Sequence, residues 1–248
     1  RYAIEAGVLD LVGMTRALIA DPYLPTKIAN KTEDQIRPCV GASMCIDGIY
    51  TAGAAFCIHN PSTGRELELP QTIDAAKAKR NVAVVGGGPA GLEAARTLAE
   101  KGHTVTLFEA NDSLGGQINI AIRSPRRRDL QGITDWRTQE LTRLGVAVKL
   151  NSYVDASDLS EAGFDAIVVA TGGMPKALEI PGGNHVLESW DVLSGSKRVT
   201  GDVLIYDDHG GTQALDLAEN LAQSGANVEL VTPERNMSVD VGGMVASA

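Results

Sequence analysis

A glycine-rich turn at residues 86–91, Gly-Gly-Gly-Pro-Ala-Gly, follows an apolar run at 82–85. An unbroken apolar run of this length is typical of a strand that is covered on both faces of a sheet. A helical pattern then extends from Ala90 to Lys101, and a second strand is predicted from Thr104 to Glu109. Strand, glycine turn, helix and strand within about thirty residues predict a βαβ unit, which restricts this part of the chain to a parallel α/β sheet.

Further strands are expected at apolar runs separated by helical stretches, namely 146–150, 166–170, 203–206 and 228–231. We therefore expect an open, parallel, Rossmann-like sheet. Residues 1–30 predict a helical tail, a short strand from Leu9 to Met14, and a helical stretch from Ala17 to Ile28 that Asp21-Pro22 interrupts. This is one βα unit without partner strands. Residues 31–80 are irregular and end in a polar linker.

Three of the four glycines of the turn have distinct expected roles. Gly86 allows the tight turn, Gly88 lets the backbone approach a pyrophosphate, and Gly91 lets helix and strand pack closely. Pro89 and Ala90 open the helix, whose N-terminus offers N–H groups and the positive end of a dipole to phosphates. The turn predicts a dinucleotide-type site, and a glycine turn without a ligand is the alternative.

Glu109 ends the second strand about 20 residues after the turn, where a carboxylate accepts hydrogen bonds from a ribose. Its charge would repel a 2′-phosphate, which the adenosine of FAD, NAD and ADP lacks. The stretch from Glu109 and Ala110 to Gly116 and Gln117 resembles the Glu-x5-Gly-Gly-Gln motif of flavoproteins with two dinucleotide-binding domains. Ala170-Thr171-Gly172-Gly173 resembles the Ala-Thr-Gly motif of the same proteins.

A second strand-turn-helix unit is altered at its turn. Residues 203–206 predict the strand and 213–224 the helix, but Asp-Asp-His-Gly-Gly-Thr stands between them at 207–212. Two carboxylates at the phosphate position would repel a pyrophosphate, and the missing early glycine blocks close approach of the backbone. We expect this unit to keep the fold without binding a nicotinamide dinucleotide well. His209 is expected to cap the helix or lie at the surface, with a redox role as the alternative.

Three cysteines, Cys39, Cys45 and Cys57, precede the glycine turn. Ala42 stands where a further cysteine would complete an iron–sulfur pattern, and alanine has no donor atom, so four-cysteine ligation by this motif is impossible. Several alternatives remain open. They are a 4Fe–4S cluster with water or His59 as fourth ligand, a 3Fe–4S cluster, a zinc ion held by three cysteines and His59, and an empty site with ordinary buried thiols.

With these motifs in order, the whole chain resembles the carboxy-terminal part of the iron–sulfur flavoproteins that include trimethylamine dehydrogenase, histamine dehydrogenase and 2,4-dienoyl-CoA reductase. Members like N-methylproline demethylase are most similar, judging from Arg-Pro-Cys-Val-Gly at 37–41 and Cys-Ile-His-Asn-Pro at 57–61. The resemblance implies FMN in a TIM barrel, and Arg16 matches the arginine region that contacts the FMN phosphate; Thr15 replaces the usual glycine. A surface or ion-pair role is the alternative for Arg16.

The implied organisation has four parts. They are the last βα unit of the barrel at 1–30, the cysteine segment and linker at 31–80, an incomplete FAD- or ADP-binding domain at 81–200, and the start of an inserted NAD(P)-like domain at 201–248. The residues leave FAD and ADP both open at the 86–91 site, and the resemblance to amine dehydrogenases favours ADP. Since the chain begins at Arg1 in mid-pattern, we expect it to be a piece of a longer protein and inactive by itself.

For the intact enzyme the resemblance implies a flavin-dependent oxidoreductase. It would demethylate or dehydrogenate an N-methylated amine and pass electrons to an electron-transfer flavoprotein. An NAD(P)H-dependent enoate or 2,4-dienoyl-CoA reductase is the alternative within this class, and a non-catalytic module that binds ADP or FAD is the alternative outside it. The catalytic residues and the substrate are not readable from this chain.

Composition narrows the partners and the setting. A net charge of −9 argues against nonspecific binding to nucleic acid or anionic membranes, and the basic run at 126–128 is followed by Asp129, which favours a solvated surface segment over a local anion site. No apolar run is long enough to span a bilayer. Three cysteines do not form a secreted disulfide framework, so we expect a cytoplasmic protein. A homodimer is left open.

Overall fold

The computed structural model describes residues 2–176 and 178–239, and its strands form two parallel sheets. The larger sheet has four strands in the order β3-β2-β1-β4, and the smaller one pairs β5 with β6. The strands are β1 (Asn81–Val85), β2 (Thr104–Phe108), β3 (Ala147–Lys149), β4 (Ala166–Val169), β5 (Asp202–Tyr206) and β6 (Asn227–Val231). The predicted α/β class with parallel strands is therefore confirmed.

The helices alternate with these strands from β1 onward and stand alone before it. They are α1 (Tyr2–Glu5), α2 (Arg16–Ala20), α3 (Leu24–Ala29), α4 (Met44–Ala52), α5 (Pro89–Glu100), α6 (Ile118–Ala121), α7 (Gln131–Arg143), α8 (Ala156–Glu161), α9 (Ser189–Ser194) and α10 (Gln213–Gln223). Short 3-10 helices occur at Glu33–Gln35, Pro125–Leu130 and Gly183–His185.

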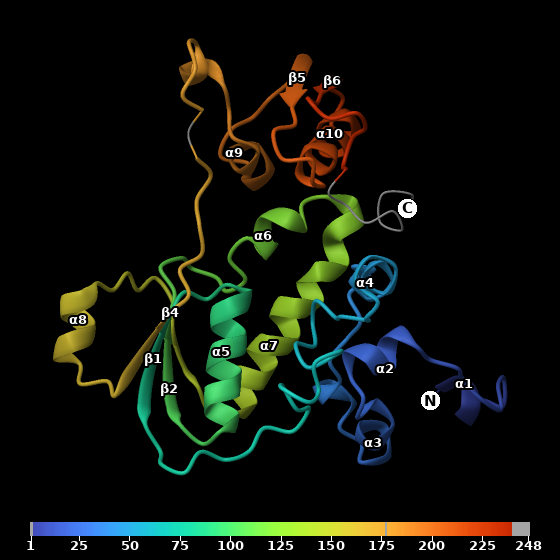
Figure 1. Ribbon diagram of the computed structural model, residues 1–248, viewed down its shortest axis with the longest axis vertical. Coiled ribbons are helices and arrows are strands. Elements are labelled where there is room, and N and C mark those ends of the chain that lie inside the picture. The colour runs from blue at the N-terminus through green and yellow to red at the C-terminus, as the bar shows by residue number, and fades with distance from the viewer. Residues whose placement is uncertain (1, 177, 240–248) are drawn as a thin grey trace.

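Helices cover the larger sheet on both faces. On one face α5 and α7 lie side by side, and α8 stands on the other (Figure 1). Alternation along β1 explains this arrangement, because Val84 packs with Leu92 of α5 and Leu141 of α7, whereas Ala83 packs with Leu159 of α8. A fully buried leucine side chain contributes about 1.5–3 kcal/mol, so these layers hold the strand ends, and the loops that follow them, in place.

The smaller sheet packs against α10 and is tied to the rest by charged contacts. Its core is formed by Ile205 with α10 residues such as Leu217. The arginine run at 126–128 faces α10: Arg126 Nε lies 3.1 Å from a carboxylate oxygen of Glu219, and Arg127 Nε lies 3.5 Å from one of Asp216. The run therefore makes ion pairs with a neighbouring helix, a role that the sequence reading did not include.

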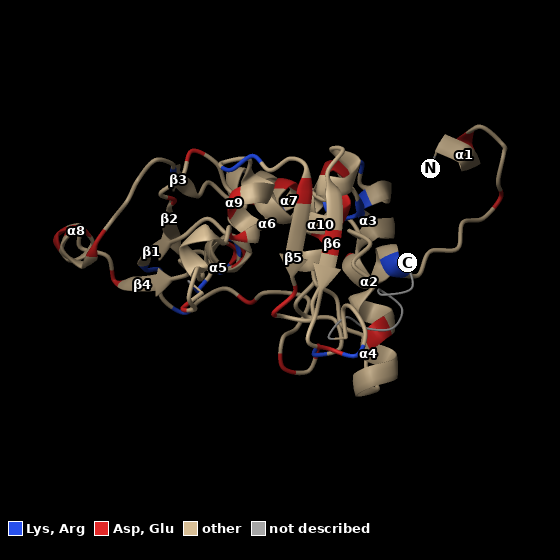
Figure 2. Cartoon of the chain, turned by 90° about the horizontal axis from the view of Figure 1, so that it is seen from above, with Lys and Arg blue, Asp and Glu red and all other residues tan. Residues whose placement is uncertain are grey.

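The predicted strand at Leu9–Met14 is wrong. These residues form coil, and all but Met14 are exposed, with Leu11 87% exposed. A strand needs a partner for its backbone hydrogen bonds, and within residues 2–176 and 178–239 this segment has none. Figure 2 shows α1 standing away from the body of the chain at the far end of this segment. The predicted helical stretch is confirmed as α2 and α3, with the break at Asp21.

Charged residues of both signs are interspersed over the elements in Figure 2. No helix in the described part of the chain is long and apolar enough to cross a membrane.

Candidate functional site

Three loops meet at the carboxyl ends of β1, β2 and β4. These strands are parallel neighbours, so the loops that follow them emerge at the same edge of the sheet. Backbone hydrogen bonds then join the loops: Gly86 N donates to Phe108 O at 2.8 Å, Ala170 N donates to Val85 O at 2.8 Å, and Gly115 N donates to Gly87 O at 2.9 Å. The three motifs recognised in the sequence thus lie together in space.

Two glycines of the turn are required by the packing of the protein itself. Gly86 has φ +106°, and a Cβ there would lie 2.3 Å from the carbonyl oxygen of Ala170. A Cβ on Gly91 would lie 1.8 Å from the carbonyl oxygen of Gly86. A tight turn at the first position and close helix–strand packing at the last are the roles that the sequence predicts for them.

Gly88 differs from both, since neither its backbone nor its packing demands glycine. Its φ of −74° and ψ of 179° are open to any residue, and a Cβ would meet only the Cα of Gly116, at 4.0 Å. Gly88 is the N-cap of α5, where the first N–H groups have no partner within the helix. Pro89 and Ala90 follow it and are exposed. Open space in front of free N–H groups is what a pyrophosphate needs, so these residues fit an ADP or FAD phosphate.

Glu109 is buried beneath this turn and is 6% exposed. Its Oε2 accepts a hydrogen bond from Gly87 N at 2.6 Å, and its Oε1 accepts from the backbone N and the side-chain Nδ2 of Asn111, both at 2.8 Å. Two carboxylate oxygens offer about four acceptor positions, so a ribose hydroxyl still has a place. The sequence reading missed Asn111, and it missed that Glu109 holds the glycine turn in shape.

The remaining motif residues pack on the turn or face solvent. Gly116 has φ +53°, and a Cβ there would lie 3.0 Å from the Cα of Gly88, so the Gly-Gly pair lies directly against the turn. Gln117 Nε2 donates to the carbonyl oxygen of Gly173 at 3.3 Å, which links the second and third loops. Ala110, Thr171 and Gly172 are exposed at this edge. The nucleotide roles of all these residues stay predictions.

The altered turn after β5 satisfies its own backbone N–H groups. Asp207 is 4% exposed, and its Oδ1 accepts hydrogen bonds from His209 N at 3.2 Å and Gly210 N at 3.0 Å. This carboxylate therefore takes up N–H groups that a phosphate would otherwise meet. The expectation of weak nicotinamide dinucleotide binding rests on charge repulsion and on the missing early glycine, and the structure adds a carboxylate that caps the turn. His209 itself is exposed.

The cysteine segment forms a small hollow of about 20 Å³. Cys39, Cys45 and Cys57 all line it, together with Ala42 and Arg16, and the three thiols are free. No group of three or more Cys, His, Asp or Glu side chains that could hold a metal ion occurs among residues 2–176 and 178–239. The shared hollow fits the predicted role of the cysteines in position, whereas the ligand set is incomplete, so metal binding stays a prediction.

His59 does not line this hollow and is fully buried beside Trp136 instead. The two rings meet edge to face with their centroids 5.3 Å apart, and Nδ1 of His59 donates to the carbonyl oxygen of Pro38 at 2.8 Å. Burial, followed by the charge of Arg137, lowers the pKa of His59 from 6.5 to about 3. A buried, neutral ring packed on Trp136 argues against His59 as the fourth ligand.

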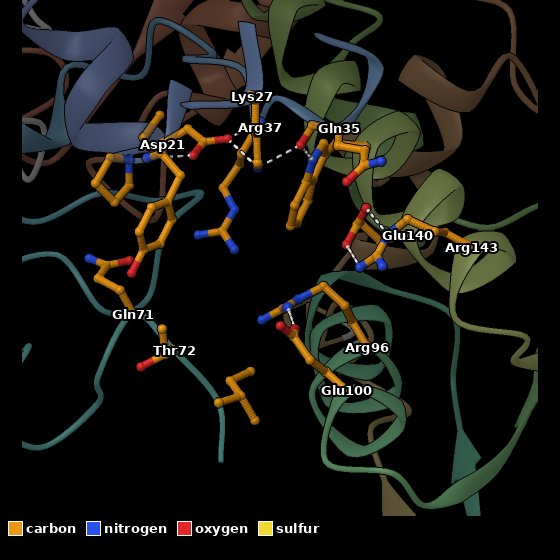
Figure 3. A pocket seen from close by; sticks show the side chains of 15 residues that line it. Asp21, Lys27, Gln35, Arg37, Gln71, Thr72, Arg96, Glu100, Glu140 and Arg143 are labelled. Atoms are coloured by element: carbon orange, nitrogen blue, oxygen red, sulfur yellow. Dashed lines mark hydrogen bonds and ion pairs between the residues drawn. The ribbon is translucent and has the colours of Figure 1, made fainter. Parts of the chain in front are cut away.

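A second cavity, larger than this hollow, lies elsewhere, beside the carboxy-terminal half of α5. It has a volume of about 310 Å³, and Arg37 and Trp136 are among its lining residues (Figure 3). None of the glycine-motif residues lines it, and the sequence reading did not identify it, because its walls come from segments far apart in the chain. We rank the glycine turn above this larger cavity as the nucleotide site, because only the turn offers backbone N–H groups at a helix N-terminus.

Comparison with known proteins agrees with the motifs. The probable N-methylproline demethylase of Rhizobium meliloti (strain 1021) is 47% identical over 245 residues, which cover 98% of this chain and 36% of the relative. The multifunctional alkene reductase/demethylase of Caballeronia cordobensis is 44% identical over 243 residues, which cover 98% of this chain and 35% of the relative. The chain therefore spans about a third of the length of the curated relatives it matches.

A solved structure and a protein family complete the comparison. The histamine dehydrogenase of Rhizobium sp. 4-9 has a TM-score of 0.85 at 31% identity, with 95% of this chain and 37% of that one covered. The predicted resemblance to demethylases and amine dehydrogenases is thereby confirmed. Residues 80–241, which include the glycine turn and all six strands, match the family described as pyridine nucleotide-disulphide oxidoreductase. The chain belongs to the pyridine nucleotide-disulphide oxidoreductase family.

Proposed function

We propose that this chain is the nucleotide-binding part of a flavin-dependent oxidoreductase that, as a full-length protein, oxidises an N-methylated amine. The observation that carries the proposal concerns Gly88, at the open N-terminus of α5. Neither its backbone conformation nor the packing around it requires a glycine. Relatives at 44–47% identity named as demethylases support the reaction class.

The ligand at this site is ADP or FAD, because the adenosine and pyrophosphate that the motifs recognise are common to both. The turn at 86–91 would hold the pyrophosphate at its N–H groups, and Glu109 would accept from the ribose. Gly116, Gln117, Thr171 and Gly172 would close the site from the neighbouring loops. A bound FAD would supply two-electron and one-electron transfer, whereas ADP would serve assembly alone.

The second turn supports one direction of electron flow. Asp207 takes up the N–H groups of its own turn, which disfavours a nicotinamide dinucleotide there. Electrons would then leave toward an electron-transfer flavoprotein rather than arrive from NADPH. The second candidate is an enoate reductase, which the relative named alkene reductase/demethylase favours. The third is a nucleotide-binding module without turnover.

The segment before β1 would connect this site to an FMN-bearing barrel. We place the end of that barrel at 1–30, the cysteine segment and linker at 31–80, the FAD- or ADP-binding domain at 81–200, and the start of the NAD(P)-like domain at 201–248, whose residues 240–248 lie outside the described part. Arg16 begins α2 and would contact the FMN phosphate. Cys39, Cys45 and Cys57 would hold an iron–sulfur cluster with three thiolates. The protein would be cytoplasmic, without nucleic-acid or membrane partners.

The test is to identify the ligand first and the reaction second. Mass spectrometry of material extracted from the purified chain should reveal ADP or FAD. The visible spectrum of the chain distinguishes the two, because only FAD absorbs visible light and colours the protein yellow. Full-length protein should reduce an artificial electron acceptor with N-methylproline and not with proline. Protein that carries neither nucleotide, and fails to bind either when added, would contradict the proposal. NADPH-dependent reduction of an enoate without amine oxidation would favour the second candidate.

A further inference from the structure

The 310 Å³ cavity is a site apart from the nucleotide loops. It lies between the segment from α2 to Arg37, the loop at 71–73, and the helices α5 and α7. Its α5 residues are Arg96 and Glu100, which lie about 10 and 16 Å from the N-terminus of the helix at about 1.5 Å per residue. A ligand in this cavity would therefore not overlap a pyrophosphate at Gly88.

The charges that line the cavity do not balance. It has four cationic side chains and three carboxylates among the residues that line it. Three cations are matched, in the pairs Lys27–Asp21 at 2.6 Å, Arg143–Glu140 at 2.6 Å, and Arg96–Glu100. The fourth cation is Arg37, whose guanidinium makes no hydrogen bond or ion pair with any residue in the described ranges. One positive charge is thus left over.

Arg37 is held in place with this charge directed into the cavity. Its backbone N donates to Asp21 Oδ2 at 2.8 Å, and its guanidinium lies 4.4 Å from the centroid of the Trp136 ring. Trp136 is itself fixed, because its Nε1 donates to the carbonyl oxygen of Gln35 at 3.0 Å. In Figure 3 the terminal nitrogens of Arg37 point into open space. The guanidinium is therefore preorganised for a ligand.

Arg37 is partly buried, which makes its lack of a partner costly. Its Nε is buried without a hydrogen-bond partner. Burial, the largest effect, lowers the pKa of Arg37. The charges of Arg96 and Arg137 lower it further, against the opposing charges of Glu93 and Asp21. A charge that is partly withdrawn from water gains from a partner, and an anion that enters from solvent would supply it.

We propose that this cavity binds a small monocarboxylate whose carboxylate pairs with Arg37. A single uncompensated charge calls for a monoanion, and the planar guanidinium matches a planar carboxylate. A volume of about 310 Å³ is at the lower end of the range for small-molecule sites. Pro22, Tyr23 and Ile73 form apolar wall beside the polar Gln71 and Thr72, so the ligand would have a short apolar body. This site goes beyond the proposed function, since no residue of the turn at 86–91 lines it.

The first test uses Trp136 as the reporter in the 248-residue chain. The chain has two tryptophans, so Trp190→Phe leaves Trp136 as the only one. Propionate should change the Trp136 fluorescence in a saturable way, because it meets the guanidinium that lies on the ring. Propionamide has the same shape without the charge and should bind at least about tenfold more weakly. Equal binding of the two, or no saturable response to propionate, would overturn the proposal, and tighter binding of inorganic phosphate would overturn the choice of a carboxylate.

A matched pair of substitutions tests the residue. Arg37→Gln and Arg143→Gln each remove one positive charge from the same cavity, but Arg143 is paired with Glu140 and its side chain is 42% exposed. Propionate binding should weaken at least about tenfold in Arg37→Gln and less than about threefold in Arg143→Gln. Equal losses in the two variants would refute a specific role for Arg37. If Arg37→Gln fails to fold, as judged by circular dichroism, the comparison of propionate with propionamide on the Trp190→Phe chain decides.

Discussion

Replacing Gly88 with alanine adds a methyl group at the N-cap of α5, at a point where the protein has room for it. The new Cβ would meet only the Cα of Gly116 at 4.0 Å, which is an ordinary van der Waals contact, and the φ of −74° suits alanine. Alanine restricts the unfolded chain more than glycine does, which stabilises the folded protein by about 0.4–1 kcal/mol. Losing glycine as a preferred N-cap residue destabilises it by a similar amount. The free energy of unfolding of the ligand-free protein should therefore change by less than about 1 kcal/mol.

Nucleotide binding should respond very differently. Phosphate oxygens must come within about 2.7–3.2 Å of the backbone N–H groups at this turn, and the methyl group would stand in that approach. Losing two charge-assisted hydrogen bonds at about 1.5–3 kcal/mol each removes about 3–6 kcal/mol of binding free energy. The Kd for ADP should rise by about 10²–10⁴-fold.

The assay compares thermal melting of the ligand-free chain with calorimetric titration of ADP. Gly13→Ala serves as the matched control, since a Cβ on Gly13 meets nothing within 4 Å and lies far along the chain from the turn. Gly91→Ala serves as the opposite case, because its Cβ would lie 1.8 Å from a carbonyl oxygen and should cost at least about 3 kcal/mol of stability. An ADP affinity within about fivefold of the unsubstituted chain, in a Gly88→Ala protein that melts normally, would refute the assignment of the phosphate site.

Three further predictions concern other residues. His59 is buried, and this burial is the main reason that its pKa is lowered to about 3. As the pH falls below about 6.5, His59 takes up a proton in the unfolded chain but not in the folded one. The free energy of unfolding should therefore fall as the pH falls from about 6.5 toward about 3, by up to about 5 kcal/mol near the folded pKa. Urea melts between about pH 7 and about pH 4.5 measure the slope, and a His59→Gln variant with the same slope would contradict this cause. Ala42→Cys adds a fourth thiol to the hollow that three cysteines line, and anaerobic reconstitution should then raise bound iron and sulfide to a full 4Fe–4S complement; iron content equal to that of the unsubstituted chain would count against a cluster site. Asp207→Gly frees the N–H groups of His209 and Gly210, so the affinity for NADH, measured by fluorescence titration, should improve at least about tenfold. Asp207→Asn keeps an acceptor and loses the charge, so its affinity should lie between those of the unsubstituted chain and Asp207→Gly. Unchanged affinity in both variants would show that this carboxylate does not block the turn.

Hydrophobic pattern and turn residues were sufficient to predict the strands β1 to β6 and the helices α5 and α10. The run at 82–85 became the buried strand β1, and the glycines after it became the turn into α5. The run at Leu9–Met14 is also mostly apolar, although it includes Asp10 and Gly13, and it did not become a strand. The two runs differ in whether a neighbouring strand is present to accept and donate backbone hydrogen bonds. β1 lies between β2 and β4, and the earlier segment lies beside neither. Apolar composition predicts burial, but hydrogen-bond partners come from elsewhere in the chain.

The candidate nucleotide site divides in the same way. Gly86, Gly91 and Glu109 could be assigned to a site from spacing alone, because a strand-turn-helix unit places them within one short stretch. Asn111 could not, since its contact with Glu109 depends on how the loop after β2 folds back. A short polar residue two positions after a strand-terminal carboxylate is the signal that was available.

Local order of residues was enough to establish the parallel α/β unit, its glycine turn and the altered second turn, because these features arise within a few turns of chain. Only the tertiary structure decided that Gly88 is open to a ligand and that Asp207 caps its own turn. It also decided that the guanidinium of Arg37 lies on the ring of Trp136 without a carboxylate partner in the described part of the chain. Free space, capping and charge pairing depend on atoms that distant segments bring together, and no pattern along the chain records those distances.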